Sequence, residues 1–335
     1  MNEAPSAPLR APSRLARIQE PVRERLDGVT EEIRRIIHSD FEIQEEVNDY
    51  LLKMRGKLFR PTLLLLTSQV GDRPHEDALP LAAVVELVHL ATLVHDDAVD
   101  HSVLRRGLPT VNQLWNHQVA IIAGDFLYSR SVLELTRVGR LDAIRALAAA
   151  SNEMSVGELR QLVSFDALEF TEEDYYRLIS CKTASLMGAS CEIGAIVGIE
   201  GYREPFRRYG EALGMAFQIA DDLLDYEGSE ERTGKPVGHD LRERKVTLPL
   251  VEALRRCGPD DRERVRSFFT QVEPSDEEIA AIVELVRTAG GLEYARERAR
   301  HYAEIAGAAL AEVPERGEAR DALQAAIGYA VERSR

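Results

Sequence analysis

Cysteine and basic charge are scarce in this 335-residue sequence. The three cysteines, Cys181, Cys191 and Cys257, are too few for a disulfide framework and odd in number, which favours a reducing compartment. Lys and Arg total 42 against 57 Asp and Glu, so the formal net charge is −15. Because nucleic acid backbones and anionic membrane surfaces attract basic patches, this acidity argues against both as the main partner.

Long hydrophobic runs are also missing. A membrane span needs roughly 18 uninterrupted apolar residues, and the nearest candidate, residues 81–94, is interrupted by Glu86 and His89. Residues 1–20 lack the apolar segment of a secretory signal and carry several prolines, which predicts a flexible N-terminal tail. We therefore expect a cytoplasmic protein without a stable membrane anchor.

The remainder of the chain follows a helical period. The hydrophobic fraction of 44% is sufficient for a full core. Residues 22–38 place apolar side chains three or four positions apart, as one face of a helix requires. Similar patterns occur at residues 63–70, 81–99, 118–138, 141–162, 173–199, 207–226, 247–256, 262–269, 276–289, 292–311 and 321–332. Since neither a long alternating β pattern nor an internal repeat interrupts them, we predict one all-α domain over residues 21–335 with ten or more helices.

Two copies of the pattern Asp-Asp-x-x-Asp, at residues 96–100 and 221–225, are the most distinctive feature of the sequence. Residues four apart share one face of a helix, so the first and last aspartates of each copy lie together. Mg²⁺ prefers oxygen ligands and is commonly shared between one or two carboxylates and substrate phosphates. One copy alone is as readily a solvated acidic surface, but its recurrence after a second apolar helix favours a metal clamp. The expected metal ligands are Asp96, Asp100, Asp221 and Asp225.

Basic residues accompany both acidic motifs despite the negative total charge. They are Lys57 and Arg60 upstream, Arg105 and Arg106 after the first motif, Lys182 in mid-chain, and Lys235 and Lys245 after the second motif. Any one of them alone is more typical of an exposed surface charge. Interleaved with metal-binding acids, they indicate a site for polyanions such as diphosphates, with Mg²⁺ bridging carboxylate and phosphate oxygens.

On these residues the sequence resembles the trans-isoprenyl diphosphate synthases, also called polyprenyl synthetases. The resemblance extends from Tyr50 to Leu254 and rests on several motifs in the family's order. These are GKLFRP (56–61), VHLATLVHDDAVD (88–100), LRRGLPTVN (104–112), AGDFLYSRS (123–131), SCKTASL (180–186), FQIADDLLDYEGSEERTGKPVGHDL (217–241) and KVTLPL (245–250). It implies a homodimer and an all-α bundle of the isoprenoid-synthase type around a central cavity. It also implies a Mg²⁺-dependent trans-prenyltransferase, which condenses isopentenyl diphosphate with an allylic diphosphate to an all-trans polyprenyl diphosphate.

The resemblance further implies roles for individual residues. Isopentenyl diphosphate would be held by Lys57, Arg60, His89 and Arg106. The allylic diphosphate would be held by Arg105, Lys182, Thr183, Gln218, Lys235 and Lys245, and through Mg²⁺ by the aspartates. The residues implied to act in catalysis are Asp96, Asp97, Asp100, Asp221, Asp222, Asp225, Lys182 and Lys235. Metal ions and basic side chains would stabilise the departing diphosphate, and the released pyrophosphate would accept the proton that is lost.

Two positions depart from the family pattern. Leu58 stands where many members carry a second basic residue, so we expect a weaker diphosphate contact beside Lys57. Arg244 stands where the family often has glycine, which leaves the geometry of the loop before Lys245 open. Neither position is an expected metal ligand.

Product length in this family depends on what blocks the apolar cavity beneath the first motif. Ala91 and Thr92, one turn before Asp96, are small where short-chain synthases often place a bulky aromatic residue. We therefore expect a long-chain product, as in the bacterial enzymes that make the polyprenyl tails of quinones. A geranylgeranyl or farnesyl product is the alternative.

Three other functions fit parts of the sequence. A non-catalytic subunit of a heteromeric synthase is expected to lose metal-binding aspartates, and both motifs are intact here. A class I terpene cyclase shares the fold, but its second metal motif typically mixes Asn, Ser or Thr, and Glu, and the isopentenyl-site residues Lys57 and Arg60 argue against it. A helical interaction module leaves the interleaved acids and bases unexplained.

Overall fold

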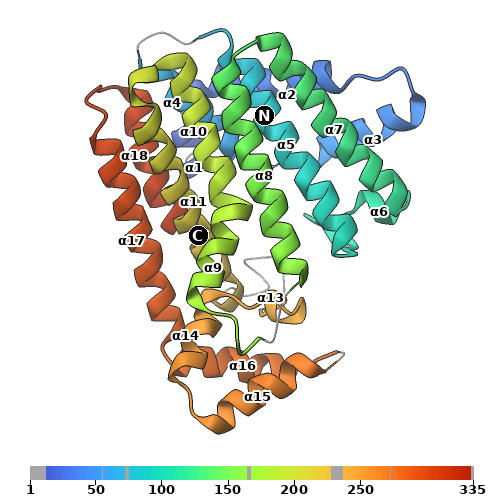
Figure 1. Ribbon diagram of the computed structural model, residues 1–335, viewed down its shortest axis with the longest axis vertical. Coiled ribbons are helices and arrows are strands. Elements are labelled where there is room, and N and C mark those ends of the chain that lie inside the picture. Colours follow the sequence, from blue (N-terminus) through green and yellow to red (C-terminus); the bar gives the residue numbers. More distant parts are fainter. Residues whose placement is uncertain are drawn as a thin grey trace, which may run out of the picture.

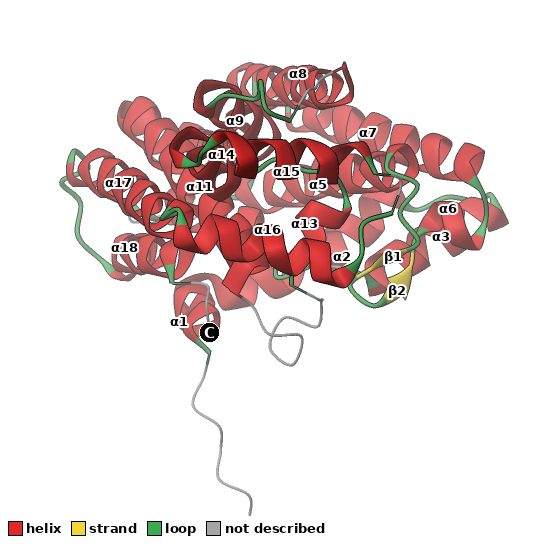
Figure 2. Ribbon diagram, turned by 90° about the horizontal axis from the view of Figure 1, so that it is seen from below, coloured by secondary structure: helices red, strands yellow, loops and turns green. Residues whose placement is uncertain are grey.

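The computed structural model describes residues 13–54, 56–71, 75–163, 167–227, 237–271 and 273–332. Over these residues the chain forms a bundle of helices, and its only strands are the short antiparallel pair β1 (Leu104–Arg105) and β2 (Leu108–Pro109), shown in Figures 1 and 2. The all-α fold class predicted from the sequence is confirmed.

The helices follow one another along the chain with short connections. The first half contains α1 (Arg14–Gln19), η1 (Glu20–Val22), α2 (Arg23–Ile37), α3 (Glu42–Lys53), α4 (Phe59–Gln69), α5 (Ala78–Val99), α6 (Val111–Leu114), α7 (His117–Val138) and α8 (Leu141–Val163). The second half contains α9 (Glu172–Ile179), η2 (Ser180–Ala184), α10 (Ser185–Gly198), η3 (Glu200–Tyr202), α11 (Arg203–Glu227), α13 (His239–Arg242), α14 (Leu248–Arg256), α15 (Pro259–Thr270), α16 (Asp276–Thr288), α17 (Gly291–Ala311) and α18 (Glu318–Val331). In Figure 1 the long helices run along the bundle, and α14, α15 and α16 lie across one end.

Most predicted helical segments occur within a few residues of their expected bounds, with two differences. Helix α3 was not predicted, because charged residues dilute its apolar stripe. The expected helix over residues 173–199 is divided by η2, a π-helical segment. Hydrophobic periodicity does not reveal such a division, since a single π turn changes the helical register by only one residue.

Residues 14–20, which the sequence assigned to a flexible tail, form helices in the structure. Ser13 caps α1 by accepting a hydrogen bond from the backbone N–H of Ala16 at 3.2 Å, and Ile18 is 2% exposed. Helix α1 contacts α18, so residues 13–20 are held by the core. The boundary predicted at residue 20 is therefore wrong, and residues 1–12 lie outside the described part of the chain.

Two buried hydrophobic clusters stabilise the bundle. The larger one includes α2, α4, α5 and α10, and the smaller one joins α9 and α11 to α14, α15, α16 and α17. Helix α5 is long and apolar enough to cross a membrane by composition, and 67% of its most apolar window is buried inside the bundle. It therefore serves here as a core helix.

Glycines allow α10 to pack closely between two other helices. A Cβ atom on Gly194 would lie 2.5 Å from Leu64 O of α4. On the other side, a Cβ atom on Gly210 of α11 would lie 2.5 Å from Met187 O of α10, and one on Gly214 of α11 would lie 2.6 Å from Ala184 Cα of η2. No real Cβ atom tolerates such distances, so the interhelical spacing depends on glycine at these positions. This packing fixes η2 against α11, which carries the second aspartate motif.

We expect Gly194→Ala to lower the free energy of unfolding by about 1–3 kcal/mol, because the added methyl group must push α10 away from α4. Urea denaturation followed by circular dichroism measures this change. The matched control is Gly328→Ala on α18, where an added Cβ atom meets nothing within 4 Å. The control should gain up to about 1 kcal/mol from helix propensity. Equal effects of the two substitutions would contradict this account of α10.

Candidate active site

The first aspartate motif lies at the C-terminal end of α5, where the chain turns into the β1–β2 hairpin. Asp97 is buried, and its two carboxylate oxygens accept hydrogen bonds from Arg105 Nε at 2.8 and 2.7 Å. Thr110 strengthens the same loop by donating to Ser102 O at 2.7 Å. Asp97 thus ties the hairpin to the helix and holds Arg105 beside the motif.

Asp96 lies among charged groups from several elements. Burial raises the pKa of Asp96 to about 6; Lys182 opposes this shift, whereas Glu158 and Asp100 add to it. Burial also raises the pKa of Asp100, against the opposing effects of Lys245 and Lys182. Negative charge at this end of α5 is therefore unfavourable until a further cation joins it.

Lys182 and Thr183 lie in η2, where the π turn changes which side chains face the neighbouring helices. Lys182 Nζ donates to Gln161 Oε1 at 2.9 Å and forms an ion pair with Glu158, so two residues of α8 hold it. Gly157 permits this approach, because a Cβ atom there would lie 2.6 Å from a side-chain carbon of η2. The lysine is thereby fixed opposite the first motif.

The second motif, on α11, contains one exposed and one buried aspartate at its start. Asp221 is exposed, whereas Asp222 is buried and accepts hydrogen bonds from Tyr175 OH at 2.6 Å and Gln218 Nε2 at 2.8 Å. Gln218 Oε1 in turn accepts a hydrogen bond from Thr183 Oγ1 at 2.8 Å. One hydrogen-bonded chain therefore joins α9, α11 and η2.

Asp225, the last residue of the second motif, organises the loop that follows. Its carboxylate accepts hydrogen bonds from the backbone N–H groups of His239 at 3.1 Å and Asp240 at 3.0 Å. Burial raises the pKa of Asp240 to about 6, and Asp225 adds to this shift. Burial lowers the pKa of Lys245, but its hydrogen bond to Glu243 at 2.6 Å and the nearby aspartates outweigh burial, so the pKa is raised.

Charged groups connect the surroundings of the two motifs, because Asp240 interacts electrostatically with Asp221 and Asp225 of the second motif and with Lys245. Lys245 interacts electrostatically with Asp100 of the first motif and Asp240 after the second, and Lys182 also interacts with Asp100. Among the described residues, no three His, Cys, Asp or Glu side chains form a group that could hold a metal ion. An ion that completes its coordination with phosphate oxygens needs only one or two carboxylates, and the candidate donors here are hard oxygens. Lys235 lies outside the described residues.

The residues expected to hold isopentenyl diphosphate come from separate segments. Arg60 on α4, His89 on α5 and Arg106 in the hairpin act on one another and surround the buried Glu86. Burial lowers the pKa of Arg60 to about 10 and that of His89 well below 6.5, so His89 is neutral at pH 7. Burial raises the pKa of Glu86 against the two arginines. This cluster is predominantly basic, in contrast to the aspartate cluster.

Lys57 lies beside this basic cluster in the loop before α4. Its Nζ donates to Tyr329 OH at 3.5 Å. A Cβ atom on the preceding Gly56 would lie 2.6 Å from both terminal guanidinium nitrogens of Arg106, and Arg106 Nη1 donates to Met54 O at 3.0 Å. Glycine at this position therefore lets Arg106 lie against the loop that carries Lys57.

Leu58 and Arg244, the two residues that depart from the family pattern, both have a left-handed backbone conformation. The φ angles are 52° at Leu58 and 62° at Arg244. The Leu58 side chain packs against the core, and the Arg244 guanidinium donates to Phe268 O and Gln271 O and lies 5.5 Å from the Phe268 ring centroid. These contacts help to offset the cost of about 1–2 kcal/mol that a non-glycine residue bears in this conformation. The loop before Lys245 thus has a backbone conformation that glycine adopts readily.

Sequence reasoning gave no role to four residues of this region, namely Glu86, Glu158, Tyr175 and Asp240. A charge inside an apolar helix is a signal for Glu86, and Asp240 falls within a motif quoted for the family resemblance. Glu158 and Tyr175 leave no such signal, because their importance depends on partners distant in the sequence. The two residues expected to set product length are small and enclosed: Ala91 is buried, and Thr92 is half-buried with its hydroxyl donating to His89 O at 2.8 Å.

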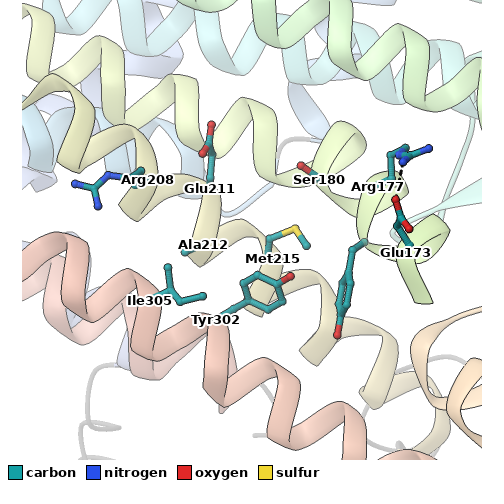
Figure 3. Close-up of a pocket in the computed structure, with 10 residues that line it drawn as sticks. Glu173, Arg177, Ser180, Arg208, Glu211, Ala212, Met215, Tyr302 and Ile305 are labelled. Atoms are coloured by element: carbon teal, nitrogen blue, oxygen red, sulfur yellow. Dashed lines mark hydrogen bonds and ion pairs between the residues drawn. The ribbon is translucent and has the colours of Figure 1, made fainter. Parts of the chain in front are cut away.

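A separate cleft of about 500 Å³ opens between α9, α11 and α17, and Figure 3 shows its lining. Met215, Tyr302 and Ile305 provide apolar surface, and Arg177 and Glu211 are among its charged residues. None of the residues predicted for the diphosphate or metal sites lines this cleft. It is therefore distinct from the candidate active site.

The comparisons with known proteins identify the family of the chain. The polyprenyl synthetase family model matches residues 41–286. Octaprenyl diphosphate synthase of Escherichia coli is 34% identical, over 96% of this chain and 99% of the relative. The short chain isoprenyl diphosphate synthase of Methanothermobacter thermautotrophicus is 37% identical, over 85% and 89%. The heptaprenyl diphosphate synthase component 2 of Geobacillus stearothermophilus is 36% identical, over 80% and 83%.

Solved structures give the same result for the fold. A decaprenyl diphosphate synthase from Rhodobacter capsulatus superposes with a TM-score of 0.90 at 36% identity, covering 96% of this chain and 99% of the other. A polyprenyl synthase from Caulobacter crescentus, complexed with calcium and isoprenyl diphosphate, has a TM-score of 0.89 at 34% identity and covers 98% and 99%. The fold and the paired aspartate motifs thus define a trans-prenyltransferase. The chain belongs to the polyprenyl synthetase family.

We expect Asp96→Asn to stabilise the metal-free protein at pH 8 by about 1–3 kcal/mol, because the raised pKa means that folding penalises the charged carboxylate. The penalty is absent below the unfolded pKa, grows as pH rises to about 6 and is constant above it. The gain should therefore fall to roughly half at pH 5. Urea denaturation in EDTA at both pH values measures it, and a gain independent of pH would contradict the electrostatic account.

Proposed function

We propose that this protein condenses isopentenyl diphosphate with an allylic diphosphate, with Mg²⁺, to an all-trans polyprenyl diphosphate longer than geranylgeranyl. The observation that supports the proposal is the position of Lys245, which interacts electrostatically with Asp100 of the first motif and with Asp240, itself beside the second motif. The aspartate region suits a diphosphate that arrives with divalent ions. The basic cluster suits a diphosphate bound directly by arginine.

The metal would be held by Asp96, Asp100, Asp221 and Asp225. Their oxygen ligands suit Mg²⁺, and the calcium bound with isoprenyl diphosphate in the Caulobacter crescentus neighbour supports a divalent ion. When bound, such ions act as Lewis acids on the departing diphosphate. A cation would also offset the burial and the like charges that raise the pKa of Asp96.

The chain's own residues would stabilise the leaving group and position the second substrate. Lys182 and Lys245 lie where the diphosphate charge develops, and Arg105 is held near them by Asp97. Arg60 and Arg106 would bind isopentenyl diphosphate so that its double bond reaches the allylic cation. The proton lost after attack would go to the released pyrophosphate, so no side-chain base is required. The apolar core around α5 would exclude water from the cation.

The long-chain product rests on the small residues one turn before the first motif. Ala91 and Thr92 fill little space, and elongation needs room in that direction. The octaprenyl and decaprenyl synthases among the relatives support this choice. A geranylgeranyl or farnesyl product remains the alternative, because another relative is a short chain isoprenyl diphosphate synthase.

The test is a product assay with purified protein, Mg²⁺, farnesyl diphosphate and radiolabelled isopentenyl diphosphate. For the wild type we expect label in polyprenols longer than geranylgeraniol. Asp96→Asn should lose turnover by orders of magnitude. Ala91→Phe should give a shorter product, because the phenyl ring obstructs the cavity. Label confined to geranylgeraniol or shorter would retain the enzyme class and contradict the long chain. No label in the wild type would favour a terpene cyclase or a subunit that needs a partner, as the component 2 relative is named.

We also propose that two copies of the chain associate through α7 and α8, and that the protein is cytoplasmic. Figures 1 and 2 show these helices next to one another. Their exposed large apolar side chains are Ile121, Ile122, Tyr128, Val132 and Leu133 on α7 and Leu141, Val156, Leu159 and Leu162 on α8. Exposed apolar residues gathered on one side mark an interaction surface, and a second copy would bury them.

Light scattering after size exclusion should give the wild type twice the mass of one chain. We expect Ile122→Asp combined with Leu159→Asp to give a monomer, because both side chains are 62% exposed and a charge there opposes burial. Ile305→Asp on α17, 40% exposed and away from these helices, is the control and should remain a dimer. A wild-type monomer would contradict the proposed interface.

A further inference from the structure

A chain of hydrogen bonds connects Tyr175, at one end, with two residues of the candidate allylic site at the other. The Tyr175 hydroxyl donates to Asp222 Oδ2 at 2.6 Å, and Gln218 Nε2 donates to Asp222 Oδ1 at 2.8 Å. Thr183 Oγ1 then donates to Gln218 Oε1 at 2.8 Å. Gln218 and Thr183 are two of the residues expected to hold the allylic diphosphate, whereas Tyr175 is 1% exposed on α9.

Asp222 determines which atoms donate and which accept in this series of hydrogen bonds. The amide group of Gln218 turns its nitrogen toward Asp222 Oδ1 and its oxygen toward Thr183 Oγ1. Both oxygens of Asp222 accept a protein donor, and the side chain is 6% exposed. Asp222 is thereby engaged in orienting its neighbours, although it belongs to the acidic motif.

Tyr175 is the partner that keeps Asp222 in this role. The Tyr175 hydroxyl donates directly to Asp222 Oδ2, which leaves Oδ1 directed at the Gln218 amide. Without this donor, the buried carboxylate has one fewer hydrogen bond and a weaker hold on the Gln218 amide.

We propose that Tyr175 is a positioning residue of the prenyl transfer reaction, which acts through Asp222 to fix Gln218 and Thr183 for the allylic diphosphate. This inference rests on the proposed function, because it assigns the affected subsite to the allylic substrate. Its effect is specific to that substrate. The isopentenyl cluster of Arg60, His89 and Arg106 has no member in the chain.

The test compares Tyr175→Phe with Tyr176→Phe in the full-length protein. The neighbouring Tyr176 hydroxyl donates to Glu172 at 2.7 Å and accepts from Arg298 at 3.1 Å, so it takes no part in the chain and provides a matched control. We expect Tyr175→Phe to raise KM for the allylic diphosphate roughly ten-fold and to change KM for isopentenyl diphosphate less than about two-fold. Tyr176→Phe should leave both values unchanged.

Two further variants separate positioning from a general loss of structure. The asparagine in Asp222→Asn has one side-chain oxygen, so it cannot accept hydrogen bonds from both Tyr175 and Gln218. Its side-chain volume is nearly unchanged, and it should raise KM for the allylic diphosphate in the same way as Tyr175→Phe. In a Thr183→Val background, Tyr175→Phe should have little additional effect on allylic KM, because the chain is already interrupted. Thermal unfolding of every variant confirms that the comparison is made on folded protein.

The outcomes distinguish this inference from the function on which it rests. A wild type without turnover would overturn both. Wild-type turnover with equal allylic KM values for Tyr175→Phe and Tyr176→Phe would overturn the positioning role alone. Equal rises in the two substrates' KM values, or independent effects of Tyr175→Phe and Thr183→Val, would also overturn it.

Discussion

The burial of closely spaced carboxylates is the constraint on which the candidate site depends. Burial and like charges raise the pKa of both Asp96 and Asp240 to about 6, which means that the fold holds negative charge where it is unfavourable. Such an arrangement persists only if the surrounding scaffold is rigid. The glycine contacts between α4, α10 and α11 supply that rigidity, because they fix the helices by backbone packing. The stored repulsion is also what makes the site attractive to cations and their phosphate ligands.

The aspartates of the two motifs have different environments although their pattern is the same. Asp97 is paired with Arg105, and Asp222 accepts from Tyr175 and Gln218, so each second aspartate binds protein groups. The first aspartates have other surroundings: Asp221 is exposed, and Asp96 lies among the charges of η2 and α8. Each acidic motif therefore has two tasks. Some of its aspartates would bind a metal, and others hold the neighbouring loops and side chains in place.

The two regions proposed to bind diphosphates differ in the way they balance charge. Around the motifs, acids outnumber the nearby lysines, so a substrate diphosphate needs cations to approach. In the basic cluster, Arg60 and Arg106 surround one buried carboxylate, Glu86, and burial keeps His89 neutral. A diphosphate meets net positive charge there without a metal. This asymmetry gives each region a preference between the two proposed substrates.

The all-α fold, the positions of most helices and the motifs of the candidate site could all be predicted from the sequence. Helical periodicity and i, i+4 spacing are local properties, so they can be read along the chain. The sequence also drew attention to Leu58 and Arg244, whose left-handed backbones the structure then displayed. Only the three-dimensional packing reveals that η2 interrupts the helix over residues 173–199, and that residues 13–20 lie against the core through Leu15 and Ile18. It likewise decided the partners of Glu158 and Tyr175, because each interaction joins segments far apart in the sequence, and no local pattern records which distant helix packing brings into contact.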